Sequence, residues 1–284
     1  MANNYTRTLR FPGGLAKALT LSYDDAVVED IRLIEIMKQH GLKGTFNINS
    51  SQYIPVGYEY PTPGYGHRME KDFVTKLYTE AGMEAGIHAY THPHLEALPA
   101  AQIAYEIVRD RATLEEQFGT IVRGGAYPYG TYNDTVLQVL KDCGIAYCRT
   151  VVSTEKFDLP TDWLRLPATC HHKNPRLMEL AEKFITAEPQ PNEDAYLFYL
   201  WGHSYEFARD DNWHVIEDFA ARIGGHDDIW YATNIEICEY VEAYNSLRFS
   251  MDMKLAHNPT STDVWFMRGR KLFHVPAGKT VVLD

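Results

Sequence analysis

The stretch Leu19–Asp30, LTLSYDDAVVED, joins an apolar run to two adjacent aspartates and a small residue. The run has the β-branched and aromatic content of a buried strand, and an amphipathic segment follows it from about Val28. Asp24 and Asp25 therefore stand at the carboxyl end of a predicted strand. One of them would serve to cap the following helix, but a cap needs only one carboxylate, so the tandem pair indicates two separate tasks.

Strand-like and helix-like segments take turns along most of the chain. KGTFNIN, EAGIHAY, GGAYPYG, AYCRTVV and AYLFYLWGH read as strands, and amphipathic stretches such as AQIAYEIVRDRATLEEQFG read as helices. Alternation of this kind predicts a parallel sheet, and about seven such units predict a closed barrel. The pattern changes near Ser246 to short alternating stretches separated by Pro, Gly and Asn. We therefore predict an α/β barrel over residues 1–245 and a small β appendage, packed on the barrel, over residues 246–284.

The composition and net charge of the chain indicate which classes of partner it can have. The 284 residues are 45% hydrophobic and carry a formal net charge of −11, which indicates a folded globular chain. No cluster of Lys and Arg appears, so nucleic acid and anionic membranes are excluded as main partners, and a small neutral or cationic substrate is favoured. The start MANNYTRTLRFPGG lacks a signal-peptide pattern, and no apolar run is long enough for membrane insertion, so we predict a soluble, cytoplasmic protein. The sequence leaves homo-oligomerisation open.

The third predicted strand ends in GIHAYTHPHLEAL, where His88 and His92 stand four residues apart. That spacing lets two imidazoles converge on one ion from a helix or from a tight turn after a strand. Two imidazoles and one strand-end carboxylate leave open positions on a zinc-like ion, which is typical of a catalytic site rather than a structural one. One of the two aspartates would then bind the metal, and its neighbour would take a proton from water.

Five short motifs, TLSYDDA, HAYTH, AYPYG, TDW and WGH, follow one another in the order found in the polysaccharide deacetylases, the NodB-homology family of the family-four carbohydrate esterase type. The resemblance spans residues 16–243. It implies a distorted (β/α)7 barrel that removes acetyl groups from sugars with a divalent metal, most readily Zn²⁺, with Co²⁺, Ni²⁺ or Mn²⁺ as substitutes. By the same resemblance Asp24 is the general base, and the metal ligands are Asp25, His88 and His92.

The third and fifth motifs are also matched residue by residue. The family's Arg-Pro-Pro-Tyr is here Ala126-Tyr127-Pro128-Tyr129, so the arginine that steadies the base is missing. Either Arg123, Arg165 or another cation replaces it, or Asp24 is less strongly held in its charged form. The backbone N–H of Tyr129 still matches the oxyanion donor. The fifth motif, Trp201-Gly202-His203, resembles Leu-x-His and makes His203 the general acid.

The remaining candidates concern substrate binding. The fourth motif is stretched to DLPTDW, which leaves the roles of Asp158 and Asp162 open. His171 and His172 either contact the substrate, cap the next helix or lie in solvent. The long loop SSQYIPVGYEYPTPGYGHRMEK offers four tyrosines that either stack on a sugar ring or pack on the barrel rim. The predicted substrate-binding residues are Tyr127, Trp163, Arg165, His172 and Trp201.

Together these features favour a metal-dependent hydrolase that deacetylates an N-acetylated or O-acetylated saccharide by attack of activated water. One alternative is a C–N hydrolase of the same fold that acts on a non-sugar amide or imide. A barrel that only binds glycans is disfavoured, because such a protein has no use for a base beside a metal-bound water.

Overall fold

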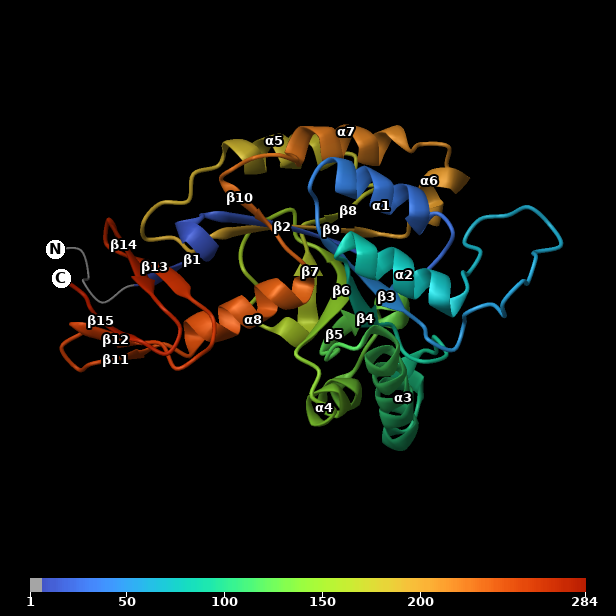
Figure 1. The fold of residues 1–284 in the computed structure, drawn as a ribbon, viewed down its shortest axis with the longest axis horizontal. Helices are drawn as coiled ribbons and strands as arrows, with labels where there is room; N and C mark the ends of the chain where they lie inside the picture. The colour runs from blue at the N-terminus through green and yellow to red at the C-terminus, as the bar shows by residue number, and fades with distance from the viewer. Residues whose placement is uncertain (1–6) are drawn as a thin grey trace.

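The computed structural model describes residues 7–284 and shows a parallel sheet curled into a distorted barrel (Figure 1). The strands lie in the order β7-β6-β5-β4-β3-β2-β9-β8. Between β7 and β8 stands a single residue, Thr169, so the two form one line that pairs with β6 on one side and with β9 on the other. Counting them as one gives seven strand positions, which confirms the predicted (β/α)7 barrel. The strands are β2 (Lys17–Asp24), β3 (Gly44–Ile48), β4 (Glu84–Ile87), β5 (Gly124–Ala126), β6 (Tyr147–Ser153), β7 (Leu166–Ala168), β8 (Cys170–His171) and β9 (Tyr196–Gly202).

Helices surround this sheet. Figure 1 shows α1, α2, α5 and α7 on one side of it and α3 and α4 on the other, with α8 toward the appendage. The helices are α1 (Asp30–Gln39), α2 (Lys71–Ala81), α3 (Ala100–Phe118), α4 (Asp134–Asp142), α5 (Leu177–Thr186), α6 (Tyr205–Arg209), α7 (His214–Ile223) and α8 (Asn234–Asn245). None of the helices in the described part of the chain is both long and apolar enough to cross a bilayer.

The pleat of the strands separates two cores. Alternate residues such as Phe198 and Leu200 of β9 pack against the surrounding helices, while Leu197, Tyr199 and Trp201 belong to the cluster inside the barrel and beneath it. The same alternation in β2 sends Leu21 and Tyr23 outward to the helices and Asp24 inward. The first catalytic candidate therefore faces the interior because of its position in the strand.

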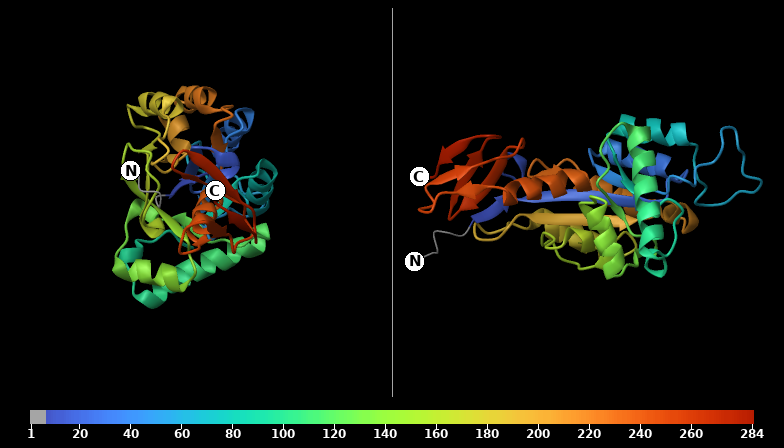
Figure 2. Two further views of the ribbon diagram at one scale, coloured as in Figure 1. Left: turned by 90° about the vertical axis from the view of Figure 1, so that its left-hand side faces the viewer. Right: turned by 90° about the horizontal axis from the view of Figure 1, so that it is seen from below.

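The C-terminal β appendage is confirmed as two three-stranded antiparallel sheets. One of them takes β1 (Arg7–Arg10) from the start of the chain, so this strand belongs with the appendage rather than with the barrel, where the sequence placed it. Figure 2 shows the appendage at one end of the molecule and the loop before α2 at the other. The other strands are β10 (Ile229–Tyr231), which pairs with β2, and β11 (Arg248–Phe249), β12 (Leu255–His257), β13 (Val264–Arg268), β14 (Lys271–Val275) and β15 (Thr280–Val282) of the appendage.

Asp30 ties α1 to two distant segments. Its carboxylate is fully buried and accepts hydrogen bonds from the Val27 amide at 3.0 Å, the Tyr78 hydroxyl at 2.6 Å and the Ser204 hydroxyl at 2.5 Å. Burial raises the pKa of Asp30 to about 7, despite these hydrogen bonds. Below about pH 7 the folded state therefore holds Asp30 as the protonated, neutral acid.

This preference predicts a pH-dependent stability. Because the pKa of an unfolded Asp is about 4, the contribution of Asp30 is fully present below about pH 4 and is lost as the pH rises through about 7. Between pH 4 and pH 8 the wild type should lose on the order of a few kcal/mol in its free energy of unfolding through Asp30, and Asp30→Asn should abolish this loss. Urea unfolding across this range measures it, with the exposed Glu35→Gln on the same helix as the control. Identical pH slopes for Asp30→Asn and the wild type would refute the argument.

Candidate active site

Polar side chains from several strands converge at the carboxyl end of the barrel. Asp24 closes β2, His88 follows β4 directly, and His203 follows β9. Asp24 Oδ2 lies 3.9 Å from His88 Nε2 and 3.8 Å from His203 Nε2. Carboxyl ends of parallel strands meet at one face, and it is there that barrels of this kind place their active sites. The structure thus brings the predicted base and the predicted acid together.

Asp25, His88 and His92 form a candidate metal centre. One ligand atom from each lies within 4.8 Å of the others. The backbone turns sharply here, because Asp25 has φ 90°, Ala26 has φ 54° and His92 has φ 58°. L-residues seldom adopt this left-handed conformation, and residues held in it cluster at functional sites. The His-x-x-x-His pair therefore converges from a strained post-strand turn rather than from a helix.

The two imidazoles are prepared to act as ligands. His88 Nδ1 lies 2.8 Å from the Ala126 carbonyl oxygen and donates to it, which leaves Nε2 free of a proton and facing the centre. Burial lowers the pKa of His88, and burial together with the neighbouring His88 lowers the pKa of His92 to about 4. Both rings are consequently neutral near pH 7, the state in which histidine binds a metal.

Arg68, from the loop before α2, approaches the same centre. Its Nη2 donates to Asp25 Oδ1 at 2.8 Å and to Gln52 Oε1 at 2.7 Å. Burial opposes the charge on Asp25, but the Arg68 guanidinium, together with His88 and His203, outweighs it and lowers the pKa of Asp25. This pair engages Oδ1 only, so the second carboxylate oxygen remains available to an ion. The three donors therefore fit a divalent metal.

The cation that replaces the missing motif arginine is Arg149 of β6. Its Nη2 forms a short ion pair with Asp24 Oδ2, and both side chains are buried. Arg149 is the register partner of Ala126 in the β5–β6 ladder, so the guanidinium has moved sideways by one strand at the same level of the barrel. Arg123 and Arg165, which the sequence suggested, do not serve this role, because Arg123 pairs with Glu239 and Glu242, and Arg165 pairs elsewhere, as described below.

These contacts hold Asp24 as a carboxylate. Burial alone would raise its pKa, but Arg149, together with His88 and His203, lowers the pKa of Asp24 well below its usual range. Asn47 of β3 donates from Nδ2 to Asp24 Oδ1 at 2.8 Å and fixes the second oxygen. Of the two alternatives that the sequence left open, the structure therefore shows the first, in which another cation replaces the motif arginine and holds Asp24 in its charged form.

His203 is flanked by carboxylates on both of its ring nitrogens. Nε2 faces Asp24, and Nδ1 lies 3.5 Å from Oε2 of Glu206 on α6. Burial opposes the charge on His203, but Glu206 and Asp24 outweigh it and raise the pKa of His203. His203 therefore keeps its proton to a higher pH than an ordinary histidine does.

The third motif supplies a left-handed turn at the edge of the site. Tyr129 has φ 58°, and its ring stacks on His94 at 3.9 Å between centroids and meets His92 edge-on at 4.6 Å. These contacts place the Tyr129 ring beside His92 of the candidate metal centre. Tyr127, in contrast, is buried and donates its hydroxyl to the Leu164 carbonyl at 2.8 Å, so its role is structural rather than in substrate contact.

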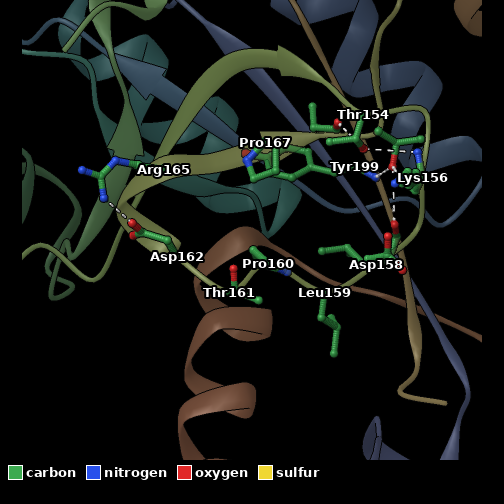
Figure 3. A pocket seen from close by; sticks show the side chains of 13 residues that line it. Thr154, Lys156, Asp158, Leu159, Pro160, Thr161, Asp162, Arg165, Pro167 and Tyr199 are labelled. Carbon is green, nitrogen blue, oxygen red and sulfur yellow. Dashed lines mark hydrogen bonds and ion pairs between the residues drawn. The ribbon is translucent and has the colours of Figure 1, made fainter. Parts of the chain in front are cut away.

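Two predicted substrate residues lie elsewhere. Trp163 and Arg165 directly precede β7 and so stand at its amino end, because the chain after β6 returns to begin a parallel strand. Trp163 packs against the core cluster that fills and underlies the barrel. Arg165 pairs with Asp162 at 2.6 Å and Asp134 at 3.4 Å. With Asp162 it lines a separate cavity of about 480 Å³ under the loop after β6 (Figure 3).

His172 and Trp201 lie behind the site. His172 is 1% exposed, stacks on Tyr23 and cannot touch a substrate in this arrangement. Trp201 is also buried, and the Arg149 guanidinium lies 4.3 Å from its ring centroid. Such cation–π contact fixes the guanidinium that holds Asp24. Both residues therefore act through other side chains, which corrects their predicted direct contact with substrate.

The tyrosine-rich loop divides into anchored and exposed parts. Tyr53 donates its hydroxyl to Gln117 at 3.0 Å and packs on the core. Tyr60 stacks on His67 with ring centroids 3.7 Å apart, and its hydroxyl oxygen accepts a hydrogen bond from the Arg68 backbone amide at 2.8 Å. Tyr58 and Tyr65 remain exposed. The loop is thus fastened at Arg68, close to the metal centre, and extends away from the barrel (Figures 1 and 2).

Comparison with known proteins agrees with this geometry. The family model described as polysaccharide deacetylase matches residues 11–148, the part of the chain that carries the first three sequence motifs. The peptidoglycan-N-acetylglucosamine deacetylase PgdA of Listeria monocytogenes is 24% identical over 141 residues, which are 49% of this chain and 26% of that protein. The chain therefore spans about a quarter of the length of this curated relative.

Two solved structures share the fold. A putative polysaccharide deacetylase from Mycobacterium smegmatis superposes with a TM-score of 0.57 at 16% identity, over 84% of this chain and 94% of that one. A family 4 carbohydrate esterase from Streptomyces lividans, in complex with acetate, gives a TM-score of 0.50 at 17% identity, over 77% of this chain and 93% of that one. At these identities the likeness concerns the fold alone.

The geometry of the triad predicts one divalent ion per chain. Added Zn²⁺ should raise the melting temperature, because an ion that binds only the folded chain stabilises it. His92→Ala should weaken binding by more than about 100-fold, since even outer partners of metal ligands contribute 10- to 100-fold. Calorimetric titration and metal analysis measure both effects. His94→Ala, beside the triad but outside it, is the control, and equal losses in the two variants would contradict the assignment.

The buried ion pair predicts a large cost for losing Arg149. Arg149→Met leaves the Asp24 carboxylate buried without a cation, which should lower the free energy of unfolding at pH 7 by about 3–5 kcal/mol. The loss should shrink in acid, because a protonated Asp24 no longer needs the cation. Urea unfolding at pH 4 and pH 7 tests this. Arg165→Met, which removes only an exposed cation, should leave stability unchanged, and equal effects of the two substitutions would show that Arg149 has no special role.

Proposed function

We propose that this chain, identified over residues 11–148 with the polysaccharide deacetylase family, is a metal-dependent hydrolase that removes acetyl groups from N-acetylated or O-acetylated saccharides. The observation that carries the proposal is the position of Asp24. Its Oδ2 lies between Nε2 of a candidate metal ligand, His88, and Nε2 of a candidate acid, His203, at 3.9 and 3.8 Å. A base and an acid next to each other, beside a candidate metal triad, support hydrolysis of an acyl group.

The metal would be held by Asp25, His88 and His92. Two imidazoles and a carboxylate suit Zn²⁺ best, and Co²⁺, Ni²⁺ or Mn²⁺ can take the same donors. A divalent ion bound there supplies a Lewis acid for the acetyl carbonyl and a lowered pKa for water. Arg68 binds the other oxygen of Asp25 and so fixes the direction of the carboxylate.

Asp24 would accept the proton of the attacking water. The Arg149 ion pair and the Asn47 hydrogen bond keep it ionised and oriented, so the carboxylate is ready near neutral pH. His203 would deliver a proton from Nε2 to the leaving nitrogen or oxygen, because its raised pKa favours the charged form. The Tyr129 N–H would donate to the negative charge that develops on the acetyl carbonyl oxygen. The three groups come from different strand ends, so base, acid and oxyanion donor can act together.

The substrate is proposed as an N-acetylated sugar. The Listeria relative, a peptidoglycan-N-acetylglucosamine deacetylase, supports an acetamide substrate, and the net charge of −11 is compatible with a neutral saccharide. The second candidate is a C–N hydrolase acting on a non-sugar amide or imide. It is favoured by the departures at Ala126 and Trp201, which change the surroundings of the base relative to the family motif. An assay of N-acetylated and O-acetylated sugars against cyclic imides and ureides separates the two.

The proposed function predicts the behaviour of Asp24→Asn. The substitution keeps the shape and removes the proton acceptor, so turnover should fall by about 10²- to 10⁴-fold. Metal content should stay unchanged, because Asp25 and the two histidines remain. Acetate release and metal analysis measure the two quantities, with Asp162→Asn at the opposite end of β7 as the control. Loss of metal together with activity would show that Asp24 is a ligand rather than the base.

A further inference from the structure

A cluster of basic side chains surrounds one carboxylate behind the acid. Oε2 of Glu206 lies 3.2 Å from His171 Nε2, 3.4 Å from His172 Nε2 and 3.5 Å from His203 Nδ1. Oε1 of Glu206 lies 2.8 Å from Lys173 Nζ and also accepts from Arg209 Nη2 at 3.2 Å. None of the five sequence motifs contains Glu206. Its carboxylate nevertheless contacts the fifth-motif histidine on the side opposite Asp24.

Two chemistries fit such a cluster. His171, His203 and Glu206 bring ligand atoms within 4.8 Å of one another, a spacing that a metal ion also requires. However, the Lys173 amide donates to His171 Nδ1 at 3.1 Å, so this nitrogen is an acceptor and the proton of the neutral ring is on Nε2. A protonated Nε2 cannot bind a metal, but it can donate to Glu206. The two cations at Oε1 also disfavour a further positive ion. The cluster is therefore an anion surrounded by donors.

We propose that Glu206 is a positioning residue that fixes His203 as the acid: its carboxylate faces Nδ1 at ion-pair distance, so that this nitrogen keeps its proton and Nε2 faces Asp24 and the substrate. This rests on the proposed function. Glu206 follows His203 by one turn, and its amide donates to the His203 carbonyl at 3.1 Å. Ser204 between them binds the buried Asp30, which anchors the turn to α1. The distance from imidazole to carboxylate is thus set by a rigid local fold.

Charges from every neighbouring element act on His203. Asp24 and Asp25 face it from the end of β2, Glu206 from α6 and His172 from the residue after β8. Burial opposes the charge on Glu206, but His171, His203 and Lys173 together outweigh it and lower the pKa of Glu206 well below its ordinary value, so it stays a carboxylate. A permanent anion at Nδ1 favours the tautomer with Nδ1–H and stabilises the imidazolium. Without it, the ring would be free to turn or to change tautomer.

The test compares Glu206→Gln with Asp210→Asn. Asp210 shares the Lys173 and Arg209 ion pairs, and none of its contacts in the described chain reaches His203, so it is a matched control. Glu206→Gln should lower kcat on an N-acetyl sugar by about 10- to 100-fold, while KM changes less and activated aryl acetates, which need little protonation to leave, lose less. Asp210→Asn should stay within about twofold of the wild type. Equal kcat in Glu206→Gln and wild type, or equal losses on both substrates, would overturn the proposal.

A measurement without substrate separates this proposal from the proposed function. The ¹⁵N shifts of His203, assigned by comparison with His203→Gln, report which ring nitrogen carries the proton and at what pH the ring titrates. The Nδ1–H tautomer in the wild type and its loss, with a lower pKa, in Glu206→Gln would support the positioning role even if no saccharide were hydrolysed. An unchanged tautomer and pKa in Glu206→Gln would overturn it. So would a second Zn²⁺ per chain that disappears in Glu206→Gln, because the cluster would then be a metal site.

Discussion

The ion pair between Asp24 and Arg149 is the constraint around which the site is arranged. A carboxylate inside a barrel, 2% exposed, is very costly unless a cation and hydrogen bonds compensate it. Arg149 and Asn47 supply both, from β6 and β3. Trp201 then covers the guanidinium, and the ring of His88 lies beside the same carboxylate oxygen. The buried charge of Asp24 therefore determines which residues the strands β3, β6 and β9 place at that level of the barrel.

The position of Arg149 explains which parts of the site the sequence could predict. Asp24, Asp25, His88 and His92 were found because each follows a recognisable strand, and local order along the chain places them at one face. Arg149 was missed because its relation to Ala126 is lateral, between two strands 23 residues apart in the chain numbering, and register across a sheet is not written in either segment. One signal was present, since a lone arginine within AYCRTVV implies a buried charge that needs a partner.

The errors at the fourth motif have a different physical origin. TDW has the family's letters, and the barrel fold itself was predicted correctly from the alternation of strands and helices. Yet the loop after β6 returns to the other end of the barrel before β7 begins, so Trp163 is carried away from the metal centre. Loop paths depend on long-range packing, which a short motif does not contain. Glu206 was missed for the complementary reason, because it lies outside every motif while its carboxylate contacts His203.

The two carboxylates on either side of His203 also explain how the proposed acid and the proposed base can coexist, with His203 Nε2 and Asp24 Oδ2 3.8 Å apart. A proton shared between Asp24 and His203 would settle on whichever group has the higher pKa, and either role would be lost if the order were reversed. Arg149 pushes the pKa of Asp24 downward, and Glu206, against the effect of burial, helps to push that of His203 upward. The proton therefore remains on the His203 imidazole, and the Asp24 carboxylate remains unprotonated. Because the two shifts come from different strands and helices, the assignment of acid and base is a property of the folded barrel rather than of either residue.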